Sequence, residues 1–158
     1  MVIIRDQFVF NKMVLGEEKQ VAAMIKKVFK KYIASDYTSQ GVSTFLQFIN
    51  PAAIYCRNFR GNSVTFVCRM GDRIVGVLEI QGWKHILLLF VDDAYHRRGI
   101  SRELISRAAQ VCRKEGQEKV TVNASPYGEP IYKKLGFIPT DSQQERDGIK
   151  FTPMELVL

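Results

Sequence analysis

The stretch Val91–Leu104, VDDAYHRRGISREL, decides the fold. It joins an apolar run, Ile86–Val91, to a basic turn containing Gly99, and an amphipathic helix begins directly after the turn. The first amides of a helix have no partners within the helix, and the helix dipole adds partial positive charge there. A strand, a glycine-containing turn and a helix N-terminus therefore predict a site that binds phosphate. The arginines of the turn add positive charge to it.

The pattern around this stretch predicts a sheet. Alternating apolar residues predict strands over 64–70, 73–80 and 84–91, and the last is apolar on both faces, as in the middle of a sheet. The helix after the turn ends near Gly116. Residues 119–123 form a further strand. Because a long helix separates it from strand 84–91, we expect the two to be parallel neighbours joined by a right-handed crossover.

The N-terminal part predicts helices. Residues 2–5 are expected to form a short strand, and helical spacing of apolar residues predicts helices over 17–32 and 39–49. Pro51 is expected to stop the second helix. The lysines of the first helix fall opposite its apolar stripe, which is typical of a solvated outer face.

The C-terminal part predicts one short helix and a final strand. The helix covers 129–135 and leads through Gly136 into residues 137–139. The final strand covers 149–158, and Pro153 within it predicts an edge strand or a bulge because proline has no N–H to donate.

The turn and the segment 123–137, NASPYGEPIYKKLGF, together resemble the GCN5-related N-acetyltransferase (GNAT) family. The family signature is Gln or Arg, two residues, Gly, one residue, then Gly or Ala, placed between a central strand and a long helix. His96, Gly99 and Ser101 occupy these three positions, so the central glycine matches and the outer two differ.

The order of the predicted elements is similar to the GNAT fold along nearly the whole chain. The resemblance implies an α/β fold and a single domain over 1–158. It further implies a mixed central sheet of six to seven strands flanked by about four helices. The sheet would be splayed between the central strand 84–91 and strand 119–123.

The resemblance also implies acetyl-CoA as the acetyl donor. The pantetheine arm would pair with the main chain of strand 84–91, and the pyrophosphate would bind the amides of the basic turn. A polar residue at the end of strand 119–123 would bond the cofactor amide or brace the splay. The residues expected to bind the cofactor are Leu89, Phe90, Val91, Arg97, Arg98, Gly99, Ile100, Ser101, Arg102, Asn123 and Tyr132.

Two residues are the catalytic candidates. Tyr132 takes the position of the family tyrosine that faces the thioester sulfur, where a phenol can protonate the departing thiolate. The amine must lose a proton before it attacks, and Glu79, an acid within an apolar strand, is the candidate base, acting directly or through water. The alternative for Glu79 is a carboxylate at a strand edge facing solvent. His85 is a weaker base candidate, and Asp92 and Asp93 are expected to cap the loop.

Composition excludes several classes of protein. The 158 residues are 46% apolar and 25% charged, as in a globular protein, and no segment resembles a membrane span or a signal peptide. Three cysteines without ligand spacing indicate free thiols in a reducing cytoplasm, and the two histidines offer no metal site. The net charge of +7 fits a phosphate-bearing cofactor. No nucleic-acid-binding motif accompanies it, so we do not expect nucleic acid as a partner.

The sequence therefore predicts an N-acetyltransferase that moves the acetyl group of acetyl-CoA directly to a primary amine. Direct transfer is favoured because no cysteine lies in an activating motif. The alternative is a non-catalytic module that binds an acyl-CoA as a sensor or scaffold. The acceptor is not identified, and a homodimer is left open. The helix pair 17–49 is expected to wall the acceptor site, with Tyr32, Tyr37 and Phe45 lining a pocket or belonging to the core.

Overall fold

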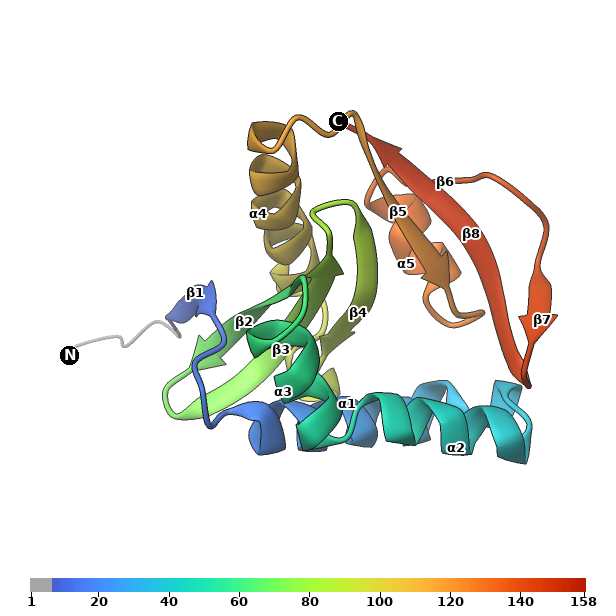
Figure 1. Cartoon of the computed structure of the whole chain (residues 1–158), viewed down its shortest axis with the longest axis horizontal. Helices are drawn as coiled ribbons and strands as arrows, with labels where there is room; N and C mark the ends of the chain where they lie inside the picture. The colour runs from blue at the N-terminus through green and yellow to red at the C-terminus, as the bar shows by residue number, and fades with distance from the viewer. Residues whose placement is uncertain (1–6) are drawn as a thin grey trace.

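The computed structural model describes residues 7–158, and it contains one mixed sheet (Figure 1). The strands are β1 Phe8–Lys12, β2 Ser63–Met70, β3 Arg73–Gln81, β4 His85–Val91, β5 Lys119–Ala124, β6 Ile138–Pro139, β7 Gln144–Arg146 and β8 Ile149–Val157. Their order in the sheet is β1-β2-β3-β4-β5-β8-β6, with β7 paired to β8. The two short strands β6 and β7 bring the described total to eight.

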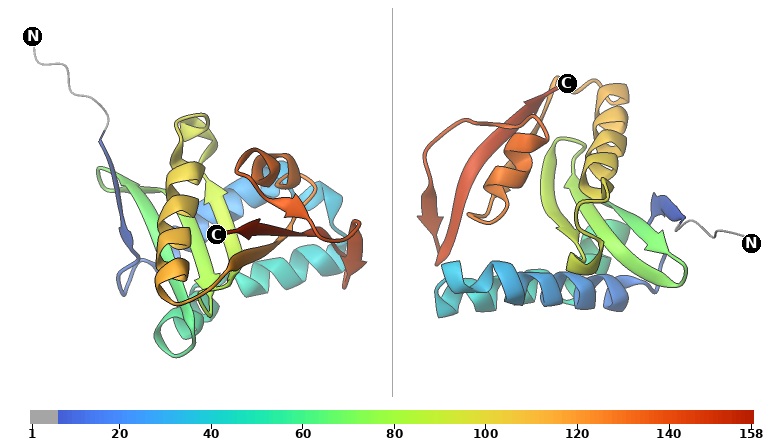
Figure 2. Two further views of the ribbon diagram at one scale, coloured as in Figure 1. Left: turned by 90° about the horizontal axis from the view of Figure 1, so that it is seen from above. Right: turned by 180° about the vertical axis from the view of Figure 1, so that it is seen from behind.

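Helices cover both faces of the sheet (Figure 2). They are α1 Glu18–Tyr32, α2 Ser39–Phe48, α3 Pro51–Phe59, α4 Ile100–Lys114 and α5 Glu129–Lys134. One core lies between the sheet and α1 to α3, and includes Phe29, Val77 and Leu88. The other lies between the sheet and α4 and α5, and includes Leu104 and Tyr132. The predicted α/β architecture is confirmed.

β4 and β5 form the parallel pair, and they separate after two residue pairs. His85 pairs with Thr121 and Ile86 with Val122, and β4 has no further partner on that side. A bulge begins the separation: Ile80 of β3 pairs with Ile86 and Glu79 with Leu88, so Leu87 is the extra residue on β4. The divergence of the two strands is visible in Figure 1. The predicted splay is therefore confirmed.

Near the N-terminus the structure differs from the prediction. Pro51 was expected only to end the second helix, but it is also the first residue of α3. Proline fits the first helical position, and Asn50 Oδ1 caps the helix by accepting a hydrogen bond from the Ala53 amide at 2.9 Å. The strand predicted over 2–5 lies outside the described residues. β1, which was not predicted, pairs antiparallel with β2.

Pro153 does not make β8 an edge strand. β8 pairs with β5 on one side and with β6 and β7 on the other. The carbonyl of Pro153 accepts a hydrogen bond from the Thr140 amide at 2.9 Å, so it faces the side of β8 on which β6 and β7 pair. The proline nitrogen, which has no hydrogen to donate, faces that side too, between the part of β8 paired to β7 and the part paired to β6. The interruption between the two short strands is where a proline is tolerated.

The β7–β8 hairpin closes the far end of the splay against α2 (Figure 1). The Thr38 amide donates to the carbonyl of Gly148, at the hairpin tip, over 3.0 Å. A Cβ on Gly41 would lie 2.2 Å from that carbonyl oxygen. The absence of a side chain at Gly41 therefore allows the two halves of the molecule to touch.

Replacing this glycine tests the closure. Gly41→Ala is expected to destabilise the protein by about 1–3 kcal/mol, because the added methyl forces the hairpin away from α2. Ser43→Ala, an exposed position in the same helix, is the control and is expected to change stability by less than about 0.5 kcal/mol. Urea unfolding measures both, and equal stability of the two variants would contradict the contact.

Candidate active site

The separation of β4 from β5 leaves main-chain groups facing a gap. The Asp92 amide donates a hydrogen bond to the Val75 carbonyl of β3 at 2.8 Å, so the backbone groups of Asp92 face β3. In a strand, the N–H and C=O groups of successive residues face opposite sides. The backbone groups of Val91 and Leu89 therefore face β5. The Val91 carbonyl accepts a hydrogen bond from His96 Nε2 at 2.8 Å. The backbone groups of Phe90, between them, face its β3 partner Val77. The remaining groups of Leu89 and Val91 are available to a ligand with amide bonds.

The basic turn presents amides without helical partners. Gly99 caps α4 in the left-handed conformation, with φ of 78°, and contributes no side-chain cap. The first helical hydrogen bond runs from Glu103 to Gly99 at 3.0 Å, so the amides of residues 100–102 precede the helical bonding pattern. Arg97, also left-handed at φ 63°, brings a cation to the same loop. This arrangement suits an anion at the N-terminus of α4.

A cavity of about 750 Å³ connects the gap to the turn. Most of the predicted cofactor-binding residues line it. They are Leu89, Phe90, Val91, Arg97, Gly99, Ile100, Ser101, Arg102, Asn123 and Tyr132. Arg98 is not among the lining residues, and its guanidinium lies over the ring of Tyr95 at 5.5 Å.

Tyr132 reaches this cavity from α5. Its ring contacts Phe137 edge-on at 5.1 Å between centroids, and the side chain is 7% exposed. Its hydroxyl has no hydrogen-bond partner within residues 7–158. Burial raises the pKa of Tyr132 above its usual value, so the phenol keeps its proton at neutral pH. The phenol can therefore donate a hydrogen bond to a ligand in the cavity.

Glu79 lies away from the cavity, in a buried ion pair. Its carboxylate is fully buried and accepts two hydrogen bonds from Arg57 of α3, at 2.8 and 3.0 Å. Arg57 also donates to the Phe48 carbonyl at 2.6 Å and lies over the Phe48 ring. Glu79 is thus not at a solvent-facing strand edge; it ties α3 and the end of α2 to the sheet.

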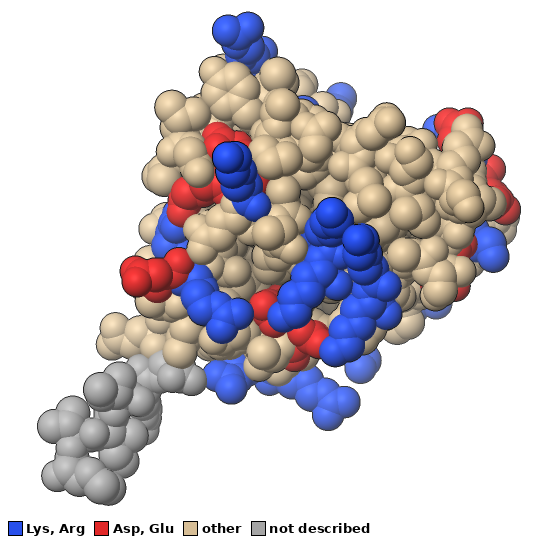
Figure 3. Space-filling view, turned by 90° about the horizontal axis from the view of Figure 1, so that it is seen from below, with Lys and Arg blue, Asp and Glu red and all other residues tan. Residues whose placement is uncertain are grey.

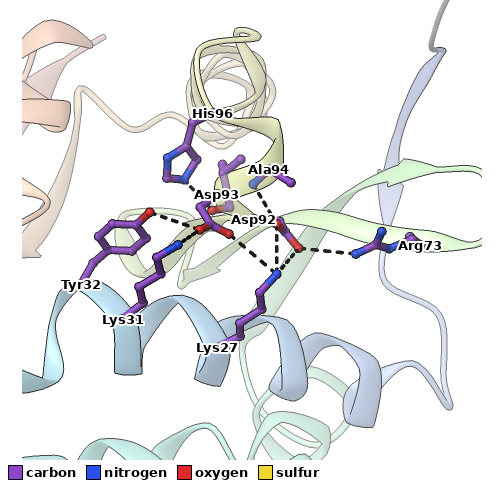
Figure 4. A network of polar contacts seen from close by, with 9 residues as sticks. Lys27, Lys31, Tyr32, Arg73, Asp92, Asp93, Ala94 and His96 are labelled. Atoms are coloured by element: carbon purple, nitrogen blue, oxygen red, sulfur yellow. Dashed lines mark hydrogen bonds and ion pairs between the residues drawn. The ribbon is translucent and has the colours of Figure 1, made fainter.

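A polar network ties α1 to the basic turn (Figure 4). Lys27 pairs with Asp92 at 3.4 Å, and Lys31 pairs with Asp93. The Tyr32 hydroxyl donates to Asp93 at 3.2 Å. Asp92 caps the loop through the Ala94 amide at 3.0 Å, as predicted. Asp93 does not; its carboxylate points to α1 because two cations and a phenol lie there.

Two of these lysines belong to an exposed basic strip on α1. Figure 3 shows Lys and Arg side chains gathered on this side of the molecule, with acidic residues between them. Lys26, Lys27, Lys30 and Lys31 are all exposed, as the sequence predicted for the outer face of the helix. The strip borders the acidic pair at the turn rather than the cavity.

Aromatic residues of the helix pair form part of the cavity wall. Tyr37 and Phe45 line it, whereas Tyr32 stacks on Tyr127, another lining residue, at 4.8 Å. Tyr127 was not predicted; its place directly after Pro126, in the segment resembling the family, was the available signal. His85 does not line the cavity, and its Nδ1 lies 2.7 Å from Thr121 Oγ1.

A family model described as an acetyltransferase (GNAT) domain matches residues 33–158. The chain belongs to the GNAT acetyltransferase family. A curated relative, N-alpha-acetyltransferase MAK3 of Arabidopsis thaliana, is 32% identical over 98 residues. The match covers 60% of this GNAT chain and 49% of the relative, so the chain spans about half the length of the curated relative it matches.

Solved structures share the GNAT fold. A GCN5-related N-acetyltransferase from Rhodopseudomonas palustris is 20% identical, with a TM-score of 0.82 over 100% of this chain and 99% of that chain. The PaiA N-acetyltransferase from Thermoplasma acidophilum, solved in complex with coenzyme A, is 15% identical. Its TM-score is 0.78 over 96% of this chain and 99% of that chain.

Residues 7–158 contain neither a membrane-spanning helix nor a cluster of metal ligands. No helix there is long and apolar enough to cross a membrane. No group of three or more His, Cys, Asp or Glu side chains in this range is placed to hold a metal ion. All three cysteines are free, as predicted, and Cys68 and Cys112 are buried.

The polar network at the turn makes a prediction for the titration of the Asp93 carboxyl. The hydrogen bond from Lys31 holds the pKa of Asp93 down at about 2, below its ordinary 3.8. Any stability from this lowering is therefore present above about pH 4 and is lost as the pH falls toward 2. Lys31→Gln is expected to raise the Asp93 pKa more than Lys27→Gln, whose charge acts only at longer range. Carboxyl NMR titrations measure both, and equal shifts would contradict the assignment.

The buried ion pair makes a separate prediction. Arg57→Met is expected to destabilise the protein by about 3–5 kcal/mol, because it leaves the Glu79 carboxylate buried without a cation. Adding Glu79→Gln to that variant is expected to recover part of the loss. Arg60→Met, on the exposed end of the same segment, is the control. Denaturant unfolding is the measurement, and a loss below about 1 kcal/mol would mean that the pair is not structural.

Proposed function

We propose that this GNAT chain is an acetyl-CoA-dependent N-acetyltransferase that transfers the acetyl group directly to a primary amine. One observation carries the proposal: a single cavity brings together open main-chain groups of β4, unpartnered amides at the start of α4, and the unbonded hydroxyl of Tyr132. These are the groups that a long amide-containing thioester with a pyrophosphate needs. Family membership supports the same activity.

The cavity suits acetyl-CoA along its whole length. Leu89 and Val91 can pair with the pantetheine amides, as a neighbouring strand would, and Asn123 lies on the opposite wall of the gap. The amides of Arg97 and of residues 99–102 can bind the pyrophosphate, with Arg97 and Arg102 balancing its charge. When bound, acetyl-CoA supplies an activated acetyl thioester. The replacement of the usual Gln or Arg by His96 is accommodated, since its ring bonds the Val91 carbonyl.

The proposed reaction is a direct displacement. The amine nitrogen, as the free base, forms a bond to the acetyl carbonyl carbon, and the bond from that carbon to sulfur breaks. Tyr132 donates its proton to the departing sulfur, which leaves as the thiol, and the tyrosine is reprotonated from solvent. The nitrogen loses a proton to water in the cavity. Glu79 lies outside the cavity and its carboxylate already accepts two hydrogen bonds from Arg57, so any proton that it takes up reaches it through water, and the proton is finally released to bulk solvent.

The free thiols of the three cysteines fit a reducing compartment, and we place the enzyme in the cytoplasm. Its proposed partners are acetyl-CoA and the amine acceptor.

Removing one oxygen tests the proposal. Tyr132→Phe is expected to lower kcat by about 100-fold while leaving the dissociation constant of acetyl-CoA unchanged, because the ring keeps its packing and only the proton donor is lost. Tyr55→Phe, whose ring contacts Phe59 outside the cavity, is the control. Thiol release measures the rate and calorimetry measures the affinity.

Two other results would redirect the assignment. An unchanged kcat in Tyr132→Phe would remove Tyr132 as the general acid. Tight acetyl-CoA binding with no transfer to any amine would favour the alternative, a module that binds an acyl-CoA without turnover.

A further inference from the structure

The cavity passes through the sheet rather than lying on one face. Tyr132 belongs to the core on the α4 and α5 face, whereas Phe29 and Phe90 belong to the core on the α1 to α3 face, and all three line the same cavity. Such a passage exists because β4 and β5 do not pair beyond Ile86 and Val122. The phosphate-binding turn and the proton donor lie on one side, which leaves the α1–α2 side for the second substrate.

The wall on the α1–α2 side is a cluster of four aromatic rings. The Phe29 and Phe45 centroids are 4.2 Å apart, Phe29 and Tyr37 are 5.5 Å apart, and Phe45 and Phe90 are 6.0 Å apart. Phe29 is fully buried, so its packing fixes the other rings. Ile33 continues the wall. A wall of this kind favours apolar and aromatic groups, which gain from leaving water and from ring contacts.

The same cavity has no acidic residue among its described lining. Its charged side chains are cationic: Arg97, Arg102 and Lys134. The reacting amine loses its charge before attack, but a second ammonium group would enter without a carboxylate to pair with it. Burying such a group is costly, so the lining disfavours diamines and polyamines.

A polar mouth continues from the aromatic wall. A smaller cavity of about 210 Å³ shares Tyr37 and Asn123 with the main one, and α2 and the β7–β8 hairpin form its other walls. It includes Arg146 and Asp147, adjacent residues of opposite charge, so it supplies no net negative potential. The Tyr37 hydroxyl has no hydrogen-bond partner within residues 7–158, and burial raises its pKa to about 12. Tyr37 is thus a neutral donor at the junction.

We propose that the α1–α2 side of the cavity is the acceptor site and selects a primary amine with an aromatic or branched apolar body and no second positive charge. The proposal rests on the proposed acetyl transfer. Both a small aralkylamine and the N-terminus of a peptide with an apolar first side chain have this chemistry. Phe45 and Tyr37 are the residues that determine the specificity.

A matched series of amines tests the selection. Pentylamine and 1,4-diaminobutane differ only by a terminal methyl in place of an ammonium group, and 2-phenylethylamine adds the ring. We expect kcat/KM with pentylamine to exceed that with 1,4-diaminobutane by at least about tenfold, with 2-phenylethylamine higher still. Phenylalanyl-glycinamide, compared with 2-phenylethylamine, distinguishes the peptide from the small-molecule source. A preference for the diamine would overturn the proposal while leaving the acetyl transfer intact.

Variants of Phe45 test whether the aromatic wall determines which amine is preferred. Phe45→Ala is expected to lower kcat/KM for 2-phenylethylamine by about tenfold or more and to leave acetyl-CoA affinity unchanged. Phe59→Ala, which removes a ring that is 43% exposed and outside the cavity, is the control. Phe45→Leu keeps apolar volume if the alanine variant fails to fold, and it is expected to lose activity toward 2-phenylethylamine more than toward pentylamine. Equal effects at Phe45 and Phe59 would contradict the assignment.

Two binding results separate this proposal from the one on which it rests. Hexanoyl-CoA is expected to bind no more than about threefold tighter than acetyl-CoA; a tenfold preference would assign the aromatic wall to a longer acyl chain and overturn the proposal. If acetyl-CoA binds but no amine of the series is acetylated, the acceptor class is wrong and the cofactor site stands. If acetyl-CoA does not bind, the proposed function fails, and the acceptor assignment fails with it.

Discussion

The structure depends on one break in hydrogen bonding, between β4 and β5. After Ile86 the two parallel strands no longer pair, and the bulge at Leu87 changes which backbone groups face the gap. Unpaired main-chain groups away from water are costly, so a gap of this kind is maintained only where a ligand or solvent can satisfy them. His96 satisfies one, the Val91 carbonyl. The rest of the fold holds the two strands apart and supplies the other residues that line the cavity.

Three sets of interactions keep the gap open in a defined shape. At one end α1 is tied to the turn through Lys31 and Asp93, which fixes the loop whose amides are proposed to bind phosphate. At the other end Gly148 of the β7–β8 hairpin touches α2 at Gly41. Beneath the sheet, the pair of Arg57 with Glu79 ties α3 to β3. The proposed cofactor and acceptor sides are therefore parts of one frame, and displacement of α1 or α2 would alter both.

Most of the features that the sequence predicted are local in origin, whereas the parallel pairing and splay of β4 and β5 came from the element order and the family resemblance. The strands of the meander, α1 and the turn before α4 follow from periodicity and from the properties of Gly99, which depend on few neighbours. β1 was missed because its pairing with β2 joins segments far apart in the chain. α3 was missed because proline both ends and begins helices, and only the cap by Asn50 decides between these. The ion pair of Glu79 with Arg57 could not be predicted, because it depends on where α3 packs against the sheet. The role proposed for Tyr132 came from the family resemblance. Its burial and the lack of a hydrogen-bond partner for its hydroxyl within residues 7–158 could be seen only in the folded structure.

Amide-resolved NMR on addition of acetyl-CoA tests whether the gap between β4 and β5 is the cofactor site. We expect the largest changes on the amides of Leu89, Val91 and residues 100–102, because these are the groups left open by the splay and the helix start. ATP alone should perturb only the residues of the turn, since it has a polyphosphate but no pantetheine arm. Changes confined to the lysines of α1, or no changes on β4 at saturating acetyl-CoA, would contradict the assignment of the gap as the cofactor site.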